Sequence, residues 1–151
     1  GTVKQFYSDI IWGDIDYMFI DCPPGTGDVP LTIFQSIPID GVVVVTTPQD
    51  LVSVIVGKAV HMADSMNIPV IGMIENMSYF ICPDCNNKHY IFGKSQLEQV
   101  IRDLYIGHAI RLPINPSLAG LMDKGEIEHM EANADLQEFA DLISTFDPDK
   151  L

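Results

Sequence analysis

The sequence predicts an α/β fold in which a parallel sheet is flanked by helices. Short apolar runs rich in β-branched residues, of which 42–45 is the purest, alternate with longer segments whose apolar residues recur at helical spacing. Runs that are apolar throughout indicate strands covered on both faces, and a strand–helix alternation favours parallel neighbours. A length of 151 residues with 47% hydrophobic content suits one domain with a real core. Residues 1–151 are therefore interpreted as a single domain.

The spacing of apolar residues predicts the first helices and strands of the chain. Residues 3–11 carry an apolar stripe at helical spacing, which predicts a helix. Residues 17–20 form a short apolar run that ends at Asp21 and a Pro/Gly loop, which predicts a buried strand. A helix is expected over 29–37, after that loop. The run GVVVVTT at 41–47 predicts a second buried strand.

The second half continues the alternation, with one interruption. A helix is expected over 51–66 and a strand over 69–74. Residues 78–92 break the rhythm, because they hold a CPDC string and a polar turn, and they are interpreted as an irregular or hairpin insertion. The remaining expected elements are helices at 93–104, 116–124 and 132–146 and a strand within 105–112 that ends at Pro113.

Charge and composition exclude several classes of partner. Eight Lys+Arg against 21 Asp+Glu give a net charge of −13, a field that repels nucleic acid and anionic lipid. No apolar run approaches the roughly 18 residues of a membrane span, and no secretory signal pattern opens the chain. Three cysteines do not suggest a disulfide framework. We expect a cytoplasmic protein that binds neither nucleic acid nor membrane.

The string FIDCPPGTGD at 19–28 is the first candidate for chemistry. An apolar strand that ends in an acid, here Asp21, is how nucleotide hydrolases of the P-loop class hold the shell of Mg²⁺. Gly25 and Gly27 would let the backbone approach a phosphate closely. The alternative is an ordinary α/β strand that ends in a turn, because acidic strand ends occur at many sites.

A phosphate-binding loop of the form GxxxxGK[ST] is absent from the sequence. The nearest string is Gly93-Lys94-Ser95, where Lys88 stands in the place of the first glycine. Asn76 follows the expected strand at 69–74, and its side-chain amide could read the edge of a base. A simple turn asparagine explains that residue equally well.

The CPDC string supplies a candidate metal site. Cys82 and Cys85 are two residues apart and can chelate one ion, but alone they make half of a four-cysteine site. Three interpretations stay open: a metal shared between two chains, a zinc site completed by His89, or inert cysteines. A thioredoxin-type redox pair fits poorly with a polar insertion. Cys22, beside Asp21, is interpreted as a packing residue.

Several stretches together resemble a known family. The sequence is similar to the Mrp/Nbp family of cytosolic iron–sulfur cluster carrier ATPases, a member of the MinD/ParA-like branch of deviant Walker-A P-loop NTPases. The resemblance covers essentially the whole chain. It is carried by WGDIDYMFIDCPPGTGD at 12–28, VVVVTTPQD at 42–50, GMIENMSYFICPDC at 72–85, HYIFG at 89–93 and RLPINPSL at 111–118.

The resemblance implies a role for each matching residue. Asp21 matches the Walker-B acid, and Gly25 to Gly27 match the loop that senses the γ-phosphate of ATP. Asn76 matches the asparagine that hydrogen-bonds adenine. Pro113 and Asn115 match the segment that closes over the base. The pair of cysteines in CPDC, Cys82 and Cys85, matches the ligands that hold one [4Fe–4S] cluster across a homodimer.

The resemblance also implies what this chain lacks. Only 20 residues precede Asp21, so the family's phosphate loop and its lysines are not in the sequence. The chain is accordingly interpreted as the C-terminal portion of a longer protein, with an exposed sheet edge where the phosphate-loop strand would pair. ATP hydrolysis is expected of the intact protein with Mg²⁺, and not of these 151 residues alone.

The implied function is ATP-dependent carriage and assembly of iron–sulfur clusters in the cytoplasm. The expected partners are a second copy, joined through the CxxC loop, and apo iron–sulfur proteins that receive the cluster. Two alternatives come from other classes. One is a MinD/ParA-like positioning ATPase, which predicts a basic membrane helix at the C-terminus, whereas residues 132–146 contain no Lys or Arg. The other is a non-enzymatic zinc-binding interaction domain.

Overall fold

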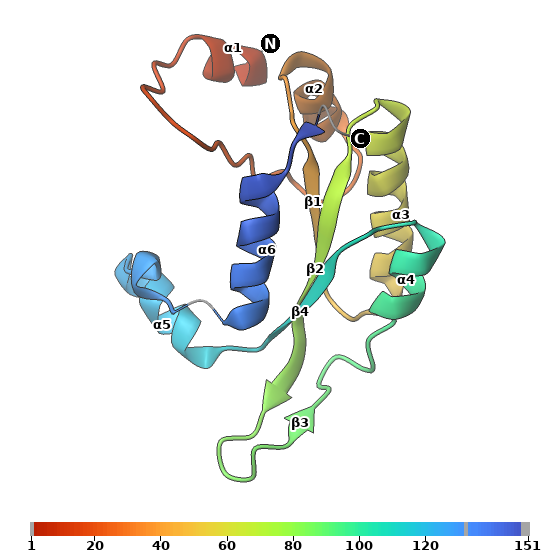
Figure 1. The fold of residues 1–151 in the computed structure, drawn as a ribbon, viewed down its shortest axis with the longest axis vertical. Coiled ribbons are helices and arrows are strands. Elements are labelled where there is room, and N and C mark those ends of the chain that lie inside the picture. The colour runs from red at the N-terminus through yellow and green to blue at the C-terminus, as the bar shows by residue number, and fades with distance from the viewer. Residues whose placement is uncertain (1, 132, 149–151) are drawn as a thin grey trace.

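A four-stranded sheet with helices on both faces organises the chain (Figure 1). The computed structural model describes residues 2–131 and 133–148, and for residues 50–53 it describes the backbone alone. The helices are α1 Thr2–Ser8, α2 Asp28–Ser36, α3 Asp50–Ser65, α4 Leu97–Asp103, α5 Pro116–Lys124 and α6 Ala134–Thr145, with a 3₁₀ turn at Ile127–His129. The strands are β1 Val42–Thr46, β2 Val70–Ile81, β3 Lys88–His89 and β4 Ala109–Pro113.

Strand β2 is the centre of the sheet. It pairs in parallel with β1 along one edge, with Val44 opposite Met73, and in parallel with β4 along the other, with Ile74 opposite Ile110. Its last residues also pair antiparallel with the short β3. The predicted α/β class with a parallel sheet and flanking helices is confirmed.

The core lies between the sheet and the helices α3 and α4. Met73 is fully buried there, in a cluster with residues of β1, of both helices and of the segment between α4 and β4: Val44, Val56, Val60, Leu97 and Ile106. The preceding residue of β2, Gly72, faces the opposite side of the sheet, because side chains alternate along a strand. A Cβ atom at Gly72 would lie 2.7 Å from the ring of Phe139. A glycine at this position therefore lets α6 pack closely on the second face (Figure 1).

The predicted strand at 17–20 is wrong. Among the described residues no helix or strand lies between Ser8 and Asp28, and Phe19 is 77% exposed. A strand is stabilised by a paired neighbour, and no described strand lies beside this run. The outer edge of β1 is likewise without a partner among the described strands.

Strand β2 is longer than predicted, ending at Ile81 rather than at residue 74, so Asn76 lies within the strand. The residue after it, Met77, has a φ of +54°, and the β2–β4 register shifts between Glu75 and Tyr79. Such a bulge redirects a strand without ending it. The expected insertion at 78–92 therefore begins inside β2 and continues into a hairpin.

The other boundaries differ mainly where a residue adopts a left-handed conformation. Helix α4 begins at Leu97 rather than 93, after Gly93 at a φ of +95°. Strand β4, Ala109–Pro113, lies within the predicted stretch and ends at Pro113 as predicted, and it follows Tyr105, which has a φ of +55°. The helices predicted at 3–11, 29–37, 51–66, 116–124 and 132–146 correspond to α1, α2, α3, α5 and α6. Residue 132 itself lies outside the described residues.

Different elements lie at the two ends of the molecule's long axis. The hairpin of β2 and β3 lies at one end of the long axis, and α1 and α2 lie at the other (Figure 1).

None of the described helices is both long and apolar enough to cross a membrane.

Candidate functional site

The two cysteines of CPDC lie in the turn of the hairpin that extends β2. The turn is closed by two backbone hydrogen bonds, from the Cys82 N–H to the Asn87 oxygen at 3.0 Å and from the Asn86 N–H to the Cys82 oxygen at 2.9 Å. Asn86 adopts a φ of +57°, which asparagine tolerates better than most residues. Backbone geometry therefore fixes this short loop around the two sulfurs.

The structure brings His89 to the cysteine pair. The ligand atoms of Cys82, Cys85 and His89 all lie within 4.8 Å of one another. Cys82 is half-buried, while the other two side chains are exposed. Across the described chain no other group of three histidine, cysteine or carboxylate side chains gathers at metal-binding distance.

The turn also stabilises one thiolate. Hydrogen bonds from the backbone N–H groups of Cys85 and Asp84, and then from the Cys85 side chain, lower the pKa of Cys82. Burial and, after it, the charge of Asp21 raise the pKa of Cys22. A metal binds the thiolate form of cysteine, and the lowered pKa of Cys82 favours that form.

Asn76 sits in the bulge of β2. Its Oδ1 accepts a hydrogen bond from the Met77 N–H at 2.9 Å, and its side chain is half-buried. Among the described hydrogen bonds none uses its amide nitrogen. A non-glycine residue at the φ of Met77 costs about 1–3 kcal/mol, and such strain clusters at functional sites.

Pro113 and Asn115 lie where β4 leaves the sheet. Pro113 pairs with Tyr79 of β2, and the Ile114 N–H donates to the Tyr79 oxygen at 2.7 Å. Asn115 caps α5, because its Oδ1 accepts from the Ser117 N–H at 3.1 Å. A capping role explains this asparagine structurally. Asn76 and Pro113 thus lie on the adjacent strands β2 and β4, and Asn115 follows β4 by two residues.

Asp21, Gly25 and Gly27 lie apart from these residues. Asp21 is exposed and borders a hollow of about 410 Å³ lined by residues of α1 and by Ile37. Gly25 has a φ of +90°, and Gly27 precedes α2 and accepts from the Leu31 N–H at 3.2 Å. Among the described hydrogen bonds and ion pairs, none joins this loop to Asn76, Pro113 or Asn115.

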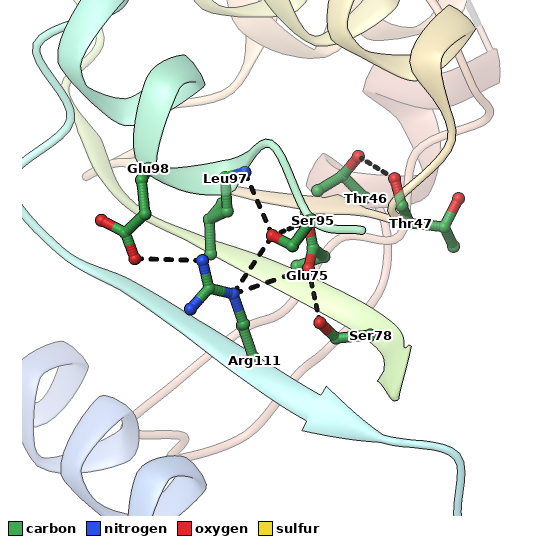
Figure 2. Close-up of polar contacts among 8 residues, drawn as sticks. All are labelled: Thr46, Thr47, Glu75, Ser78, Ser95, Leu97, Glu98 and Arg111. Carbon is green, nitrogen blue, oxygen red and sulfur yellow. Dashed lines mark hydrogen bonds and ion pairs between the residues drawn. The ribbon is translucent and has the colours of Figure 1, made fainter. Parts of the chain in front are cut away.

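A buried polar network lies along β2 before the cysteine hairpin, and the sequence analysis missed it. Glu75 is only 3% exposed; its Oε1 accepts from the Ser78 hydroxyl at 2.5 Å and its Oε2 from the Ser95 hydroxyl at 2.9 Å (Figure 2). Arg111 Nε donates to Ser95 Oγ at 3.1 Å and lies 3.7 Å from Glu75. The available signal was a lone carboxylate directly after an apolar strand run.

The network ties together three segments that meet at the candidate site. Glu75 directly precedes Asn76 in β2, and Ser95 stands between the hairpin and α4. Arg111 belongs to β4, and its Nη2 also donates to Glu98 of α4 at 3.0 Å (Figure 2). Buried polar groups that satisfy one another fix the relative position of their segments. The network therefore holds the base of the cysteine hairpin against the strand that leads to Pro113.

Comparison with known proteins connects this arrangement to a family. Residues 1–146 match ParA proteins described as NUBPL iron-transfer P-loop NTPases. An iron–sulfur cluster carrier protein from Methanocaldococcus jannaschii is 48% identical over 126 residues, which are 83% of this chain and 43% of that protein. A probable cytosolic Fe–S cluster assembly factor from Schizosaccharomyces japonicus is 40% identical over 136 residues, which are 84% of this chain and 22% of that protein.

A solved structure shares the fold. It is a nucleotide-binding protein from Archaeoglobus fulgidus in complex with ADP, with cobalt found in it. It is 37% identical, superposes with a TM-score of 0.80, and the match covers 97% of this chain and 57% of that one. This chain thus spans about half, or less, of the proteins it matches. By its sequence match over residues 1–146 and by its fold, the chain belongs to the family of NUBPL-type iron-transfer P-loop NTPases.

Proposed function

We propose that this chain is the cluster-holding part of an ATP-dependent iron–sulfur cluster carrier. The observation that carries the proposal is the geometry of Cys82 and Cys85, held in one hairpin turn whose backbone N–H groups lower the pKa of Cys82. Exposure of Cys85 leaves the pair open to a second protein. The relatives named as iron–sulfur cluster carrier proteins support the same role.

The cluster is cargo that bridges two copies of the chain. A [4Fe–4S] cluster takes four cysteine ligands, and one hairpin offers two. A twofold axis through the cluster supplies the other two, because an isologous interface repeats the same patch. The hairpin projects at one end of the molecule, where two copies can meet tip to tip (Figure 1). From such a homodimer the cluster passes to apo iron–sulfur proteins by exchange of thiolate ligands.

ATP would act at the other candidate residues. Asp21 holds Mg²⁺ through water, Gly25 and Gly27 approach the γ-phosphate, and Asn76 with the segment of Pro113 and Asn115 contacts the base. The relative from Archaeoglobus fulgidus that binds ADP supports a nucleotide at this fold. Ligands of open parallel sheets bind beyond the carboxyl ends of the strands, and Pro113 is the last residue of β4, which supports a base at this edge of the sheet.

The cell compartment and the rival function complete the proposal. We place the protein in the cytoplasm, in line with the assembly factor from Schizosaccharomyces japonicus, which is named as cytosolic. A positioning ATPase that docks on a membrane through a basic helix receives no support, because α6, Ala134–Thr145, contains neither Lys nor Arg.

Anaerobic reconstitution with iron and sulfide tests the cluster. We expect broad visible absorption, a dimer by mass, and about two iron atoms per chain, since four irons are shared by two chains. Cys82→Ser and Cys85→Ser should each abolish the absorption and the dimer. Cys22→Ser is the matched control and should retain both. A complete cluster in a monomer, or a Cys82→Ser variant with unchanged iron content, would contradict the proposal.

A further inference from the structure

We infer that Glu75 and Ser78 are positioning residues that clamp a bulge in β2 and so couple Asn76 to the cysteine hairpin. Both residues lie between the candidate base contact and the hairpin and belong to the ligands of neither. The role of Asn76 as a base contact rests on the proposed function. The clamp itself follows from strand register, burial and hydrogen bonds.

The bulge adds two residues to β2. Glu75 is opposite Arg111 of β4, and Tyr79 is opposite Pro113. Residues 76–78 of β2 therefore face a single residue of β4, whereas regular pairing would place one residue on each strand. A strand rises about 3.3 Å per residue, so straightening the bulge would shift the hairpin beyond it by about 6–7 Å.

A hydrogen bond between the two ends of the bulge closes it. The Ser78 hydroxyl donates to Glu75 Oε1 at 2.5 Å, and both side chains are buried (Figure 2). In a regular strand, residues three apart project from opposite faces, so these two side chains could not meet. The bond can therefore form only while the bulge is present, and it holds the two ends of the bulge together.

The same carboxylate is anchored outside the bulge. Glu75 Oε2 accepts from the Ser95 hydroxyl at 2.9 Å. Ser95 Oγ in turn accepts from Arg111 Nε of β4 and from the Leu97 N–H of α4, both at 3.1 Å (Figure 2). A buried carboxylate that is satisfied in this way is costly to displace. Glu75 is therefore held in place, and Ser78 is held through it.

The clamp determines how Asn76 presents its side chain. Asn76 and Met77 lie between the two clamped residues, and Asn76 Oδ1 accepts from the Met77 N–H at 2.9 Å. This contact fixes the orientation of the amide group, and it depends on the left-handed φ of +54° that Met77 adopts in the bulge. Opening the clamp would let Met77 return to an extended conformation and would release the Asn76 amide.

The clamp also determines where the hairpin begins. Strand β2 resumes its pairing with β4 at Tyr79, directly after Ser78, and the Ile114 N–H donates to the Tyr79 oxygen at 2.7 Å. Phe80 then pairs with His89 of β3. A change in the bulge therefore displaces the hairpin relative to β4. Because coupling between two sites is reciprocal, a base that holds Asn76 in the bulge should also hold the hairpin.

Amide hydrogen exchange of the metal-free 151-residue chain, followed by NMR, tests the clamp. Ser78→Ala should speed exchange of the Met77 and Ile114 N–H groups about tenfold or more relative to that of Met73, as expected for loss of a hydrogen bond to a charged group. The Met73 N–H donates to the His108 oxygen in the core and reports overall stability. Residues that merely stabilised the fold would change all three rates by the same factor.

Ser95→Ala is the matched comparison, because it removes the other hydroxyl that donates to Glu75 and lies outside the bulge. It should speed exchange of the Leu97 N–H, which donates to Ser95 Oγ. The rate at Met77 relative to Met73 should change by less than about twofold. A relative rate unchanged in Ser78→Ala, or raised equally by Ser95→Ala, would overturn the clamp.

Titration with adenosine monophosphate, followed by the same amide signals, tests the coupling to a base. In the unaltered chain the nucleotide should slow exchange at Met77 and Ile114 together. Ser78→Ala should weaken its binding about fivefold or more, the lower range of coupling between sites. Ser144→Ala is the control, because it removes a hydroxyl hydrogen bond within α6, and it should bind like the unaltered chain.

The outcomes separate the coupling from the proposed function. Equal binding in Ser78→Ala, or binding that slows exchange at Met77 but not at Ile114, would overturn the coupling. An unaltered chain that binds no adenosine monophosphate would refute the base contact of Asn76, which belongs to the proposed function. The exchange rates of Met77 and Ile114 in Ser78→Ala would still decide whether the clamp joins Asn76 to the hairpin.

Discussion

The N-terminal segment at residues 2–27 and the parallel sheet bury their apolar side chains to very different extents. In the N-terminal segment Ile11 is 96% exposed and Phe19 is 77% exposed. In the sheet Met73 is fully buried and Val44 is 7% exposed. Both regions are rich in apolar residues, so composition does not cause the difference. The sheet strands have neighbours on which to pair and helices that cover them, whereas residues 17–20 pair with no described strand.

This contrast separates two kinds of functional segment. The loop with Asp21 carries the motif that the family resemblance relates to nucleotide binding, yet no described strand pairs with the run that precedes it. The cysteine hairpin and Asn76 belong to β2, the strand that pairs with all three other strands. Metal binding should therefore be a property of the described chain, while nucleotide chemistry needs a partner for the Asp21 loop.

The largest expected effect tests the burial contrast directly. Met73→Ala should lower the free energy of unfolding by about 2–5 kcal/mol, because it opens a cavity in the fully buried core. Phe19→Ala removes a larger side chain but should change stability by less than about 0.5 kcal/mol, since that ring is mostly in water. Urea unfolding followed by circular dichroism measures both. Equal losses would mean that the N-terminal segment is packed as tightly as the sheet.

The next prediction separates function from stability in the N-terminal segment. Asp21→Asn, made in a polypeptide that joins this sequence to a phosphate loop, should slow ATP hydrolysis about 100-fold, because a metal-binding carboxylate contributes several kcal/mol to catalysis. Its unfolding free energy should not change, since Asp21 is exposed. Phosphate release and urea unfolding measure the two effects.

The 151-residue chain serves as the reference for that experiment. It contains no phosphate loop and should release no phosphate above background. Turnover by the purified chain that disappears with Asp21→Asn would show that the loop is not needed. Unchanged hydrolysis in the longer polypeptide would remove Asp21 from the Mg²⁺ site.

A smaller effect on stability is expected in the polar network around Glu75, which lies within the sheet region. Glu75→Gln should cost about 1–3 kcal/mol, because the amide group presents a donor where the carboxylate accepts two hydroxyl hydrogen bonds. Glu98→Gln is the matched control. Glu98 meets the same arginine at the surface, so its loss should be about 0–1 kcal/mol. If both variants unfold at the same urea concentration, the buried carboxylate does not hold the segments together.

The sequence was sufficient to predict the elements whose stability is local or lies within the sheet. The run at 41–47 became β1, and helical spacing located α3 and α5. It failed at 17–20, where an apolar pattern predicts burial but cannot supply the neighbour that a strand requires. The sequence also predicts that the strand ends at residue 74. In the structure a bulge at Met77 lets β2 continue past a segment that resembles a turn in sequence.

The candidate site was predictable only in part. The spacing of Cys82 and Cys85 was enough to predict them as candidate metal ligands. Sequence spacing left three interpretations of the pair open, and the role of His89 was one of them. The structure brings His89 to the cysteines through the register of the hairpin. The Glu75 network joins residues up to 36 positions apart, counting from Glu75 to Arg111, and no local pattern links them. The roles of Asp21, Asn76, Pro113 and Asn115 rest on resemblance to the family and stay predictions.

The smallest predicted effect compares one cysteine from each region. Hydrogen bonds to its sulfur lower the pKa of Cys82, whereas burial and the charge of Asp21 raise the pKa of Cys22. Only the thiolate reacts with iodoacetamide, so at a pH below both pKa values the thiol with the lower pKa has the larger reactive fraction. In the metal-free chain Cys82 should therefore be alkylated before Cys22 at neutral pH. As the pH falls, the rate at Cys82 should begin to decline only at a lower pH than the rate at Cys22. Peptide mass spectrometry after timed quenching measures both rates, and denatured chain serves as the control, in which the two rates should converge. Faster alkylation of Cys22 in the folded chain would show that the hairpin turn does not stabilise the Cys82 thiolate.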